Sequence, residues 1–177
     1  MIKIETKRQY IMELWDRDLP ELSALLQDDQ TMSDLGGVFS NTEIHEWLDE
    51  QSFYYQNSKY GIWAAMLKRN VKLIGCCGIT RENVDGLDVF ALAYLYHRDY
   101  RHKGYAAEAA KSCIRYAFEV MGFSEILAVV RDTDFPSMNV AIRSGMMARG
   151  RIMKQYCGAD TPHMVFSIKR EAKAKAK

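Results

Sequence analysis

One segment, residues 89–130, constrains the fold more than any other part of this chain of 177 residues. It opens with a nearly unbroken apolar run at residues 89–95, which is typical of a strand buried on both faces. After a short basic loop, apolar residues recur at spacings of three and four over residues 106–121 and predict one apolar stripe on a helix. Gly122 stands where a helix commonly ends, and a second apolar run follows at residues 125–130. The segment is therefore predicted to form a strand, a loop, a helix and a second strand, with the strands parallel through a right-handed crossover.

The loop between the first strand and the helix predicts a site for an anion. Its residues are Tyr100, Arg101, His102, Lys103, Gly104, Tyr105 and Ala106. The first turn of a helix exposes unpaired N–H groups and the positive end of the helix dipole, which together favour a pyrophosphate. Gly104 has no side chain to keep a phosphate away, and the three cations can supply donors and charge. The alternative is that the glycine only eases a tight turn and the cations only keep the loop soluble.

The loop resembles motif A of the GNAT N-acetyltransferases, [RQ]-x-x-G-x-[GA], which stands here as RHKGYA at residues 101–106. The longer string YRHKGYAAEAA, at residues 100–110, is most similar to the RimJ/RimL-type branch, whose members acetylate protein N-terminal amines. That branch often has N-x-x-S followed by a helix that ends in G-F. The corresponding residues here are Asp134, Ser137, Gly145 and Met146, so the serine and the glycine match. The resemblance covers most of the chain and is strongest over residues 93–146.

The resemblance implies a GNAT-like α/β fold, with a central mixed β-sheet and helices on both faces, in a single domain at residues 1–169. Residues 170–177 are expected to be a charged mobile tail. Acetyl-CoA would be the co-substrate, and no metal is expected. The pantetheine arm would lie along the end of the first strand, and the pyrophosphate would lie on the N–H groups of residues 103–107. The expected cofactor contacts are Leu95, Tyr96, His97, Arg101, His102, Lys103, Gly104, Tyr105, Ala106, Ala107, Asp134 and Ser137.

Two residues are candidates for the chemistry. Ser137 would lie near the CoA thiol by resemblance and could protonate it as it leaves. Tyr94 could order a water beside the acetyl group, or it could be a strand tyrosine packed on a helix. Asp134 replaces the family's asparagine, and an ionised carboxylate accepts hydrogen bonds but cannot donate them. Ala141 stands where many relatives carry a tyrosine acid, so this chain lacks that acid at that place.

The acceptor amine must be neutral to attack a thioester. Near neutral pH, deprotonation costs about 4 kcal/mol for a lysine-like amine but under about 1 kcal/mol for a peptide α-amine. Glu82, Asp85 and Asp88 are interpreted as solvated charges near a turn, and His97 as a polar loop residue that could still act as a base. The lack of an obvious base favours an α-amine acceptor. By resemblance, the acceptor pocket would draw on residues 28–39, 42–55 and 155–162, with these candidates: Trp47, Phe53, Tyr54, Tyr55, Tyr156 and His163.

The predicted function is direct transfer of an acetyl group from acetyl-CoA to a primary amine, with a protein N-terminus favoured. The alternatives are a polyamine or antibiotic acetyltransferase, a non-catalytic CoA-binding regulatory module, and an RNA-contacting accessory protein. The net charge of +1 argues against nucleic acid as the main partner. No apolar run is long enough to span a bilayer, so no membrane partner is expected and the cytoplasm is the expected location. The four cysteines do not have the spacing of metal ligands. The protein is expected to be a monomer or a homodimer.

The remaining elements follow from the same patterns. Strands are predicted at residues 10–15, 60–67, 71–80, 149–156 and 163–168, and helices at residues 20–27, 42–55 and 137–144. Asp85-Gly86 predicts a tight hairpin turn, and residues 28–40 are predicted to be a loop.

Overall fold

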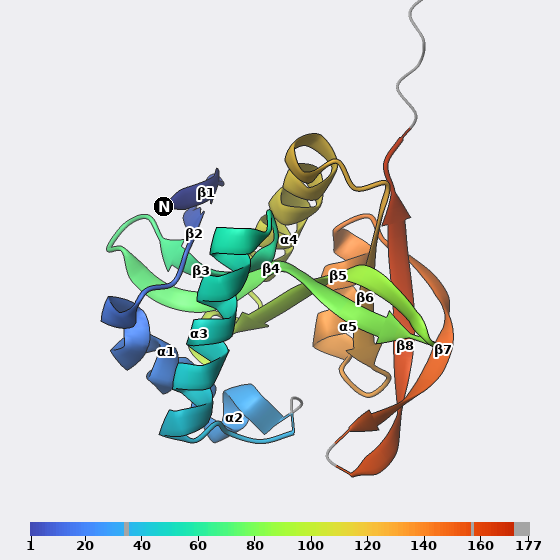
Figure 1. Cartoon of the computed structure of the whole chain (residues 1–177), viewed down its shortest axis with the longest axis horizontal. Helices are drawn as coiled ribbons and strands as arrows, with labels where there is room; N and C mark the ends of the chain where they lie inside the picture. Colours follow the sequence, from blue (N-terminus) through green and yellow to red (C-terminus); the bar gives the residue numbers. More distant parts are fainter. Residues whose placement is uncertain (34–35, 157, 172–177) are drawn as a thin grey trace, which may run out of the picture.

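The apolar runs of the chain assemble into one mixed β-sheet with helices on both faces (Figure 1). The structure, a computed structural model, describes residues 1–33, 36–156 and 158–171. Within these residues the sheet has eight strands in the order β1-β2-β3-β4-β5-β6-β8-β7. The strands are β1 (Ile2–Glu5), β2 (Gln9–Met12), β3 (Gly61–Leu67), β4 (Lys72–Val84), β5 (Leu87–Tyr96), β6 (Glu125–Arg131), β7 (Met147–Tyr156) and β8 (Ala159–Lys169). The predicted α/β fold is confirmed.

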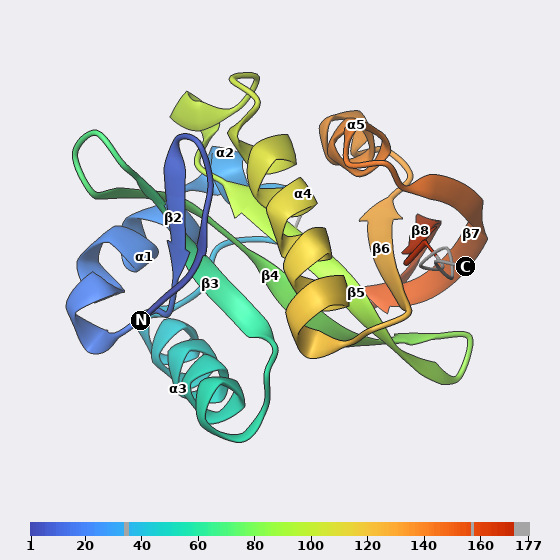
Figure 2. The same cartoon turned by 90° about the horizontal axis from the view of Figure 1, so that it is seen from above.

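The helices form two layers, one on each side of the sheet. They are α1 (Leu19–Leu26), α2 (Asp29–Met32), α3 (Asn41–Asn57), α4 (Tyr105–Tyr116) and α5 (Phe135–Arg143). Figure 2 shows α1 and α3 on one side of strands β3 and β4 and α4 on the other. The core is divided in the same way, because successive strand residues point to opposite faces. Cys76 packs with α1 and α3, whereas its neighbour Cys77 packs with α4.

The strand–loop–helix–strand unit has the predicted connectivity. Strands β5 and β6 are parallel, and α4 connects them through the loop at residues 97–104. Among the described residues, the ladder between the two strands consists of one pair, Ala91 opposite Leu127. Beyond that pair, no described residue pairs with the edge of β5 that faces β6. The two strands therefore separate toward their carboxyl ends, and the candidate site lies at this opening.

Local signals account for the starts and ends of several elements. Ser40 caps α3 by accepting a hydrogen bond from the Glu43 N–H, and the Glu43 carboxylate accepts one from the Ser40 N–H in return. Asp85 and Gly86 both have positive φ, 51° and 82°, and join β4 to β5 as the predicted hairpin turn. Helix α4 continues into one π-helical turn and ends at Gly122, whose φ is also 82°.

Several observed elements differ from the expectations, among them β1, α2 and β8. Strand β1 lies in a stretch for which no strand was predicted, because only Ile4 of its four residues is buried and the pattern is short. Helix α2 lies inside the predicted loop at residues 28–40, where the Asp28 carboxylate caps it by accepting from the Thr31 N–H at 2.8 Å. Strand β8 begins at Ala159, four residues before the predicted start at His163.

Some predictions fall outside what the structure describes. Residues 172–177 lie outside the described residues, so the mobile tail predicted at residues 170–177 stays a prediction. None of the helices in the described residues combines the length and the apolar character needed to cross a bilayer.

Candidate active site

The basic loop leads into α4 through a glycine in the left-handed conformation. Gly104 has φ of +78° and is the N-cap residue of the helix. The first intrahelical bond runs from the Glu108 N–H to the Gly104 carbonyl at 3.1 Å. The N–H groups of residues 105–107 therefore have no acceptor within the helix. These N–H groups and the helix dipole make the loop suitable for a pyrophosphate, as the sequence predicted.

A cavity of about 380 Å³ lies between the end of β5, the loop and α5. It brings together most of the predicted cofactor residues: Tyr94, Leu95, Tyr96, Arg101, His102, Gly104, Tyr105, Ala106, Ala107, Asp134 and Ser137. His97 and Lys103 are not part of its lining. The His97 ring accepts from the Asp99 N–H, and the Lys103 ammonium donates to the Asp99 carbonyl at 2.7 Å. Cofactor contact by these two side chains stays a prediction.

Arg101, the first residue of the motif, bonds to the main chain of the protein. Its Nε donates to the Tyr96 carbonyl at 3.1 Å, and its Nη2 donates to the Thr31 carbonyl at 2.8 Å. The guanidinium thus joins the loop to the end of β5 and to α2. The side chain that was expected to supply charge to a phosphate also fixes the shape of the cavity wall.

On the opposite wall, Asp134 acts as the N-cap of α5. Its Oδ1 accepts a hydrogen bond from the Ser137 N–H at 3.0 Å. An N-cap needs only an acceptor, so a carboxylate can do this as well as the asparagine of the family pattern. The Ser137 hydroxyl makes no hydrogen bond within the described residues. It is half-buried and lines the cavity.

Tyr94 ties β5 to α5 across the opening between β5 and β6. Its hydroxyl donates to the Ser137 main-chain carbonyl at 2.7 Å. Burial, and then the negative charge of Asp134, raises the pKa of Tyr94 well above its ordinary value. The phenol therefore stays protonated and keeps this hydrogen bond. A role in ordering water remains a prediction for Tyr94.

A second cavity, of about 290 Å³, opens among strands β4 to β8. It shares Tyr94, Asp134 and Ser137 with the first cavity, so the two meet at these three residues. The polar side chains that line the rest of it include Thr80, Glu82, Arg131, Lys154 and His163. Two molecules bound in the two cavities would therefore have their ends close to one another.

One ion pair lines the second cavity. The Glu82 carboxylate lies 2.5 Å from the Lys154 ammonium, and both side chains are about 70% buried. His163 is nearly buried, with Nδ1 3.0 Å from the Thr161 carbonyl oxygen. Among the described residues, no group of three or more His, Cys, Asp or Glu side chains is arranged to hold a metal ion.

Four of the six candidate acceptor residues lie away from the second cavity, and acceptor binding stays a prediction for all six. Of the six candidates, His163 lines the second cavity; Trp47, Phe53, Tyr54 and Tyr55 do not, and the Tyr156 side chain lies outside the described part of the chain. Glu82, interpreted as a solvated charge, lines it instead. The signal that could have found Glu82 is the alternation along β4, which puts it on the same face as Thr80. The sequence pattern around Lys154 does not indicate a place at this cavity, because β7 comes near β4 only through the order of the strands in the sheet.

Comparisons with known proteins agree with this geometry. Residues 9–147 match the family model of the acetyltransferase (GNAT) domain. The uncharacterized protein YkkB of Bacillus subtilis (strain 168) is 28% identical over 145 residues, which are 81% of this chain and 84% of that protein.

Three solved structures share the fold. A GNAT-family acetyltransferase from Bacillus anthracis has a TM-score of 0.80 at 21% identity, covering 96% of this chain and 98% of that one. The ribosomal-protein-S5-alanine acetyltransferase from Vibrio fischeri has a TM-score of 0.77 at 14% identity, covering 94% and 95%. The microcin C7 self-immunity acetyltransferase, in complex with acetyl-CoA and AMP, has a TM-score of 0.77 at 12% identity, covering 93% of each chain. Since the family match spans the loop, both strands of the opening and α5, this chain belongs to the GNAT family and is an acetyl-CoA-dependent N-acetyltransferase.

Proposed function

We propose that the protein transfers the acetyl group of acetyl-CoA directly to the α-amine of a protein or peptide N-terminus, with both substrates bound together. The observation that carries this proposal is the meeting of the two cavities at Tyr94, Asp134 and Ser137. A thioester in the first cavity and an amine in the second would come together there. No residue of the chain then has to carry the acetyl group.

The first cavity suits CoA. The edge of β5 beyond Ala91 is not paired with β6 in the described chain, so its main-chain groups can bond the pantetheine arm, except the Tyr96 carbonyl, which already accepts from Arg101. The N–H groups of residues 105–107 suit the pyrophosphate, and Gly104 leaves room beside them, because even a Cβ built there would meet only Arg8 Nη2, at 3.5 Å. The bound co-substrate would supply an activated acetyl thioester.

Two hydroxyl groups of the chain can handle protons at this junction. We propose that Ser137 Oγ, which has no partner among the described residues, gives a proton to the departing sulfur. The proton of the Tyr94 hydroxyl is directed to the Ser137 carbonyl, so its oxygen is left as an acceptor. We propose that this oxygen holds the water that takes the proton of the amine.

The charges of the second cavity support an α-amine acceptor. Its two carboxylates are Glu82, which is paired with Lys154, and Asp134, which caps α5. A polyamine would find little unpaired negative charge there for its several ammonium groups. An α-amine also needs less help from a base, because its deprotonation near neutral pH costs under about 1 kcal/mol, compared with about 4 kcal/mol for a lysine-like amine. The fold shared with a ribosomal-protein-S5-alanine acetyltransferase agrees with this choice.

A matched set of acceptors tests the proposal. The first peptide has a free α-amine and no lysine, the second has a blocked N-terminus and one lysine, and spermidine is the third acceptor. Release of CoA thiol, followed by mass spectrometry of the product, should show acetylation of the first peptide only. Acetylation of the lysine peptide or of spermidine, with the first peptide inert, would contradict the proposal. CoA binding without turnover of any amine would favour a non-catalytic module.

Location in the cytoplasm and a monomeric or homodimeric state stay predictions.

A further inference from the structure

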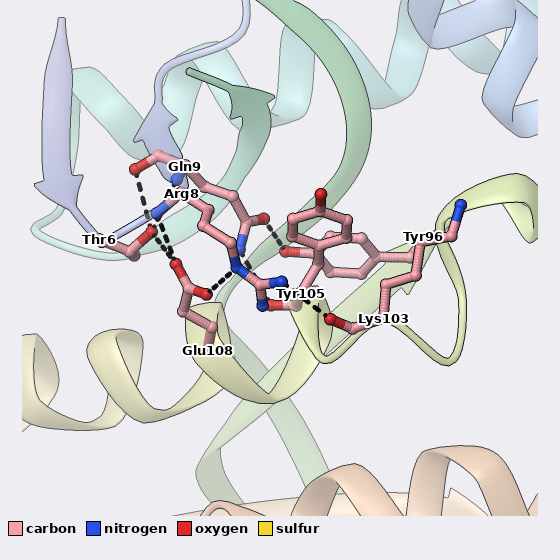
Figure 3. A network of polar contacts seen from close by, with 7 residues as sticks. All are labelled: Thr6, Arg8, Gln9, Tyr96, Lys103, Tyr105 and Glu108. Atoms are coloured by element: carbon pink, nitrogen blue, oxygen red, sulfur yellow. Dashed lines mark hydrogen bonds and ion pairs between the residues drawn. The ribbon is translucent and has the colours of Figure 1, made fainter. Parts of the chain in front are cut away.

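The turn between β1 and β2 lies against the basic loop at residues 97–104 and the start of α4, although about a hundred residues of sequence separate them (Figure 3). Three side chains from this hairpin reach α4 and its first turn: Thr6, Arg8 and Gln9. None of them was singled out by the sequence. Their contacts show how a distant segment can act on the cofactor site.

Arg8 is held in one orientation from three sides. Its Nε donates to Glu108 Oε2 at 2.6 Å, and its Nη1 donates to the Lys103 carbonyl at 3.0 Å. Its guanidinium lies over the Tyr105 ring, 4.2 Å from the centroid. A planar guanidinium can make these contacts together because its donors form a rigid fork.

Glu108 is the anchor for Arg8. Its Oε1 accepts from the Thr6 hydroxyl at 2.7 Å and from the Arg8 main-chain N–H at 2.8 Å. Burial by itself would raise the pKa of Glu108, but these hydrogen bonds and the charge of Arg8 outweigh it and lower the pKa. The carboxylate is therefore ionised at neutral pH and keeps the guanidinium in place.

The bond from Arg8 to the Lys103 carbonyl bears on the cofactor site. In a trans peptide the carbonyl and the N–H point in opposite directions, so holding the Lys103 carbonyl directs the Gly104 N–H away from Arg8. Gly104 lines the first cavity. A glycine adopts many backbone conformations, so the left-handed state of Gly104 has to be selected by contacts around it. Arg8 supplies such a contact.

Gln9 connects two parts of the first cavity's lining, the start of α4 and the end of β5, to the same hairpin. Its side chain is fully buried; Nε2 donates to the Tyr105 carbonyl at 3.0 Å, and Oε1 accepts from the Tyr96 hydroxyl at 2.7 Å. Burial keeps the pKa of Tyr96 well above its ordinary value, so the phenol remains a donor. The hairpin is thus bonded to the start of α4 and to the end of β5.

We propose that Arg8 is a positioning residue for the pyrophosphate of acetyl-CoA, and that it acts by fixing the peptide between Lys103 and Gly104. The hairpin that carries it is in this view part of the cofactor site. The inference concerns the co-substrate side alone. It stands whether the acceptor is an α-amine or another amine.

Calorimetric titration with CoA and with ADP, without any acceptor, tests the proposal. Arg8→Ala should weaken the binding of both ligands by about tenfold, which corresponds to about 1.4 kcal/mol of binding free energy. Arg8→Lys should be equally weak, because an ammonium cannot bridge the Lys103 carbonyl and Glu108 as the guanidinium does. With an active acceptor, KM for acetyl-CoA should rise by a similar factor while kcat changes less than about twofold.

The control is Glu5→Gln, which breaks an exposed ion pair with Lys68, 2.5 Å apart, at the same hairpin but away from the loop. It should bind CoA as the unaltered protein does. If Arg8→Ala fails to fold, by circular dichroism, Glu108→Gln tests the same link, because it keeps the side-chain shape and removes the charge that orients Arg8. Unchanged CoA affinity in the folded variant, full recovery in Arg8→Lys, or an equal loss in Glu5→Gln would each overturn the proposal. Failure of the α-amine proposal would leave these titrations unaffected.

Discussion

Substitution of Gly104 separates backbone strain from charge at the cofactor site. The residue has φ of +78°, and a Cβ built on it would have one neighbour within 4 Å, Arg8 Nη2 at 3.5 Å. That distance is an ordinary contact, so Gly104→Ala should cost little beyond the left-handed backbone, roughly 1–2 kcal/mol. For a chain of this size, each kcal/mol lowers Tm by about 2–4 °C.

A carboxylate at the same position adds a second effect. In Gly104→Glu the side chain would start beside the N–H groups that suit the pyrophosphate. Two like charges 4 Å apart at an effective dielectric constant of 20 repel by about 4 kcal/mol, which is about three orders of magnitude in affinity. The carboxylate could also turn to Arg8, which would draw the guanidinium away from the Lys103 carbonyl. Gly104→Gln has the same size and the same strain without the charge.

The assay is calorimetric titration with CoA, together with thermal unfolding. Gly86→Ala is the matched control, because Gly86 has φ of +82°, no neighbour within 4 Å of a Cβ, and a place in the hairpin turn away from both cavities. It should lose stability as Gly104→Ala does and bind CoA normally. If Gly104→Glu binds CoA within tenfold of Gly104→Gln, the pyrophosphate does not lie at this helix start.

Three further predictions concern the junction and the hairpin. Tyr94→Phe removes the bond to the Ser137 carbonyl and should lower Tm by about 2–4 °C, corresponding to about 1 kcal/mol; an unchanged Tm and kcat would refute the link between β5 and α5. Ser137→Ala should lower kcat by at least about tenfold and leave KM for acetyl-CoA nearly unchanged; equal turnover would remove the serine from the mechanism. Glu108 has a pKa below its ordinary value of 4.5, so its contribution to stability is present above that pH and is lost as the pH falls through the lower, folded-state pKa. Glu108→Gln should therefore lower Tm at pH 7, and this difference should shrink as the pH falls through the folded-state pKa of Glu108; a difference in Tm that does not change with pH would contradict this.

The sequence was most informative where the signals are local. The apolar run of β5, the glycine of the loop and the three-and-four spacing of α4 lie within one stretch of chain, and all were placed correctly. The start of α5 was predicted two residues late, at Ser137. Asp134 as an acceptor and Pro136 just inside the helix are the ordinary signs of a helix start, and they would have placed it at Phe135.

The lining of the second cavity could not be predicted in this way, because its residues meet only through the order of the strands in the sheet. Strand β8 pairs between β6 and β7, and this brings His163 and Lys154 beside Glu82 of β4. Neighbouring positions in each of these strands give no sign of the others. In the sequence, Glu82 near a hairpin turn and Lys154 on a distant strand both look like solvent-exposed charges. Only the assembled sheet brings them together as an ion pair.

The same reasoning applies to Arg8, and it changes how the motif is understood. The motif supplies N–H groups and a glycine, but a glycine does not select its own conformation. In this chain the loop also has bonds from Arg8 to Lys103, from Arg101 to Thr31 and Tyr96, and from Gln9 to Tyr105. The four partners that hold the loop all lie outside the motif, and two of them, Arg8 and Gln9, lie near the start of the chain. A motif match therefore predicts where the phosphate would bind, whereas in this chain the conformation of the loop also depends on side chains from distant segments.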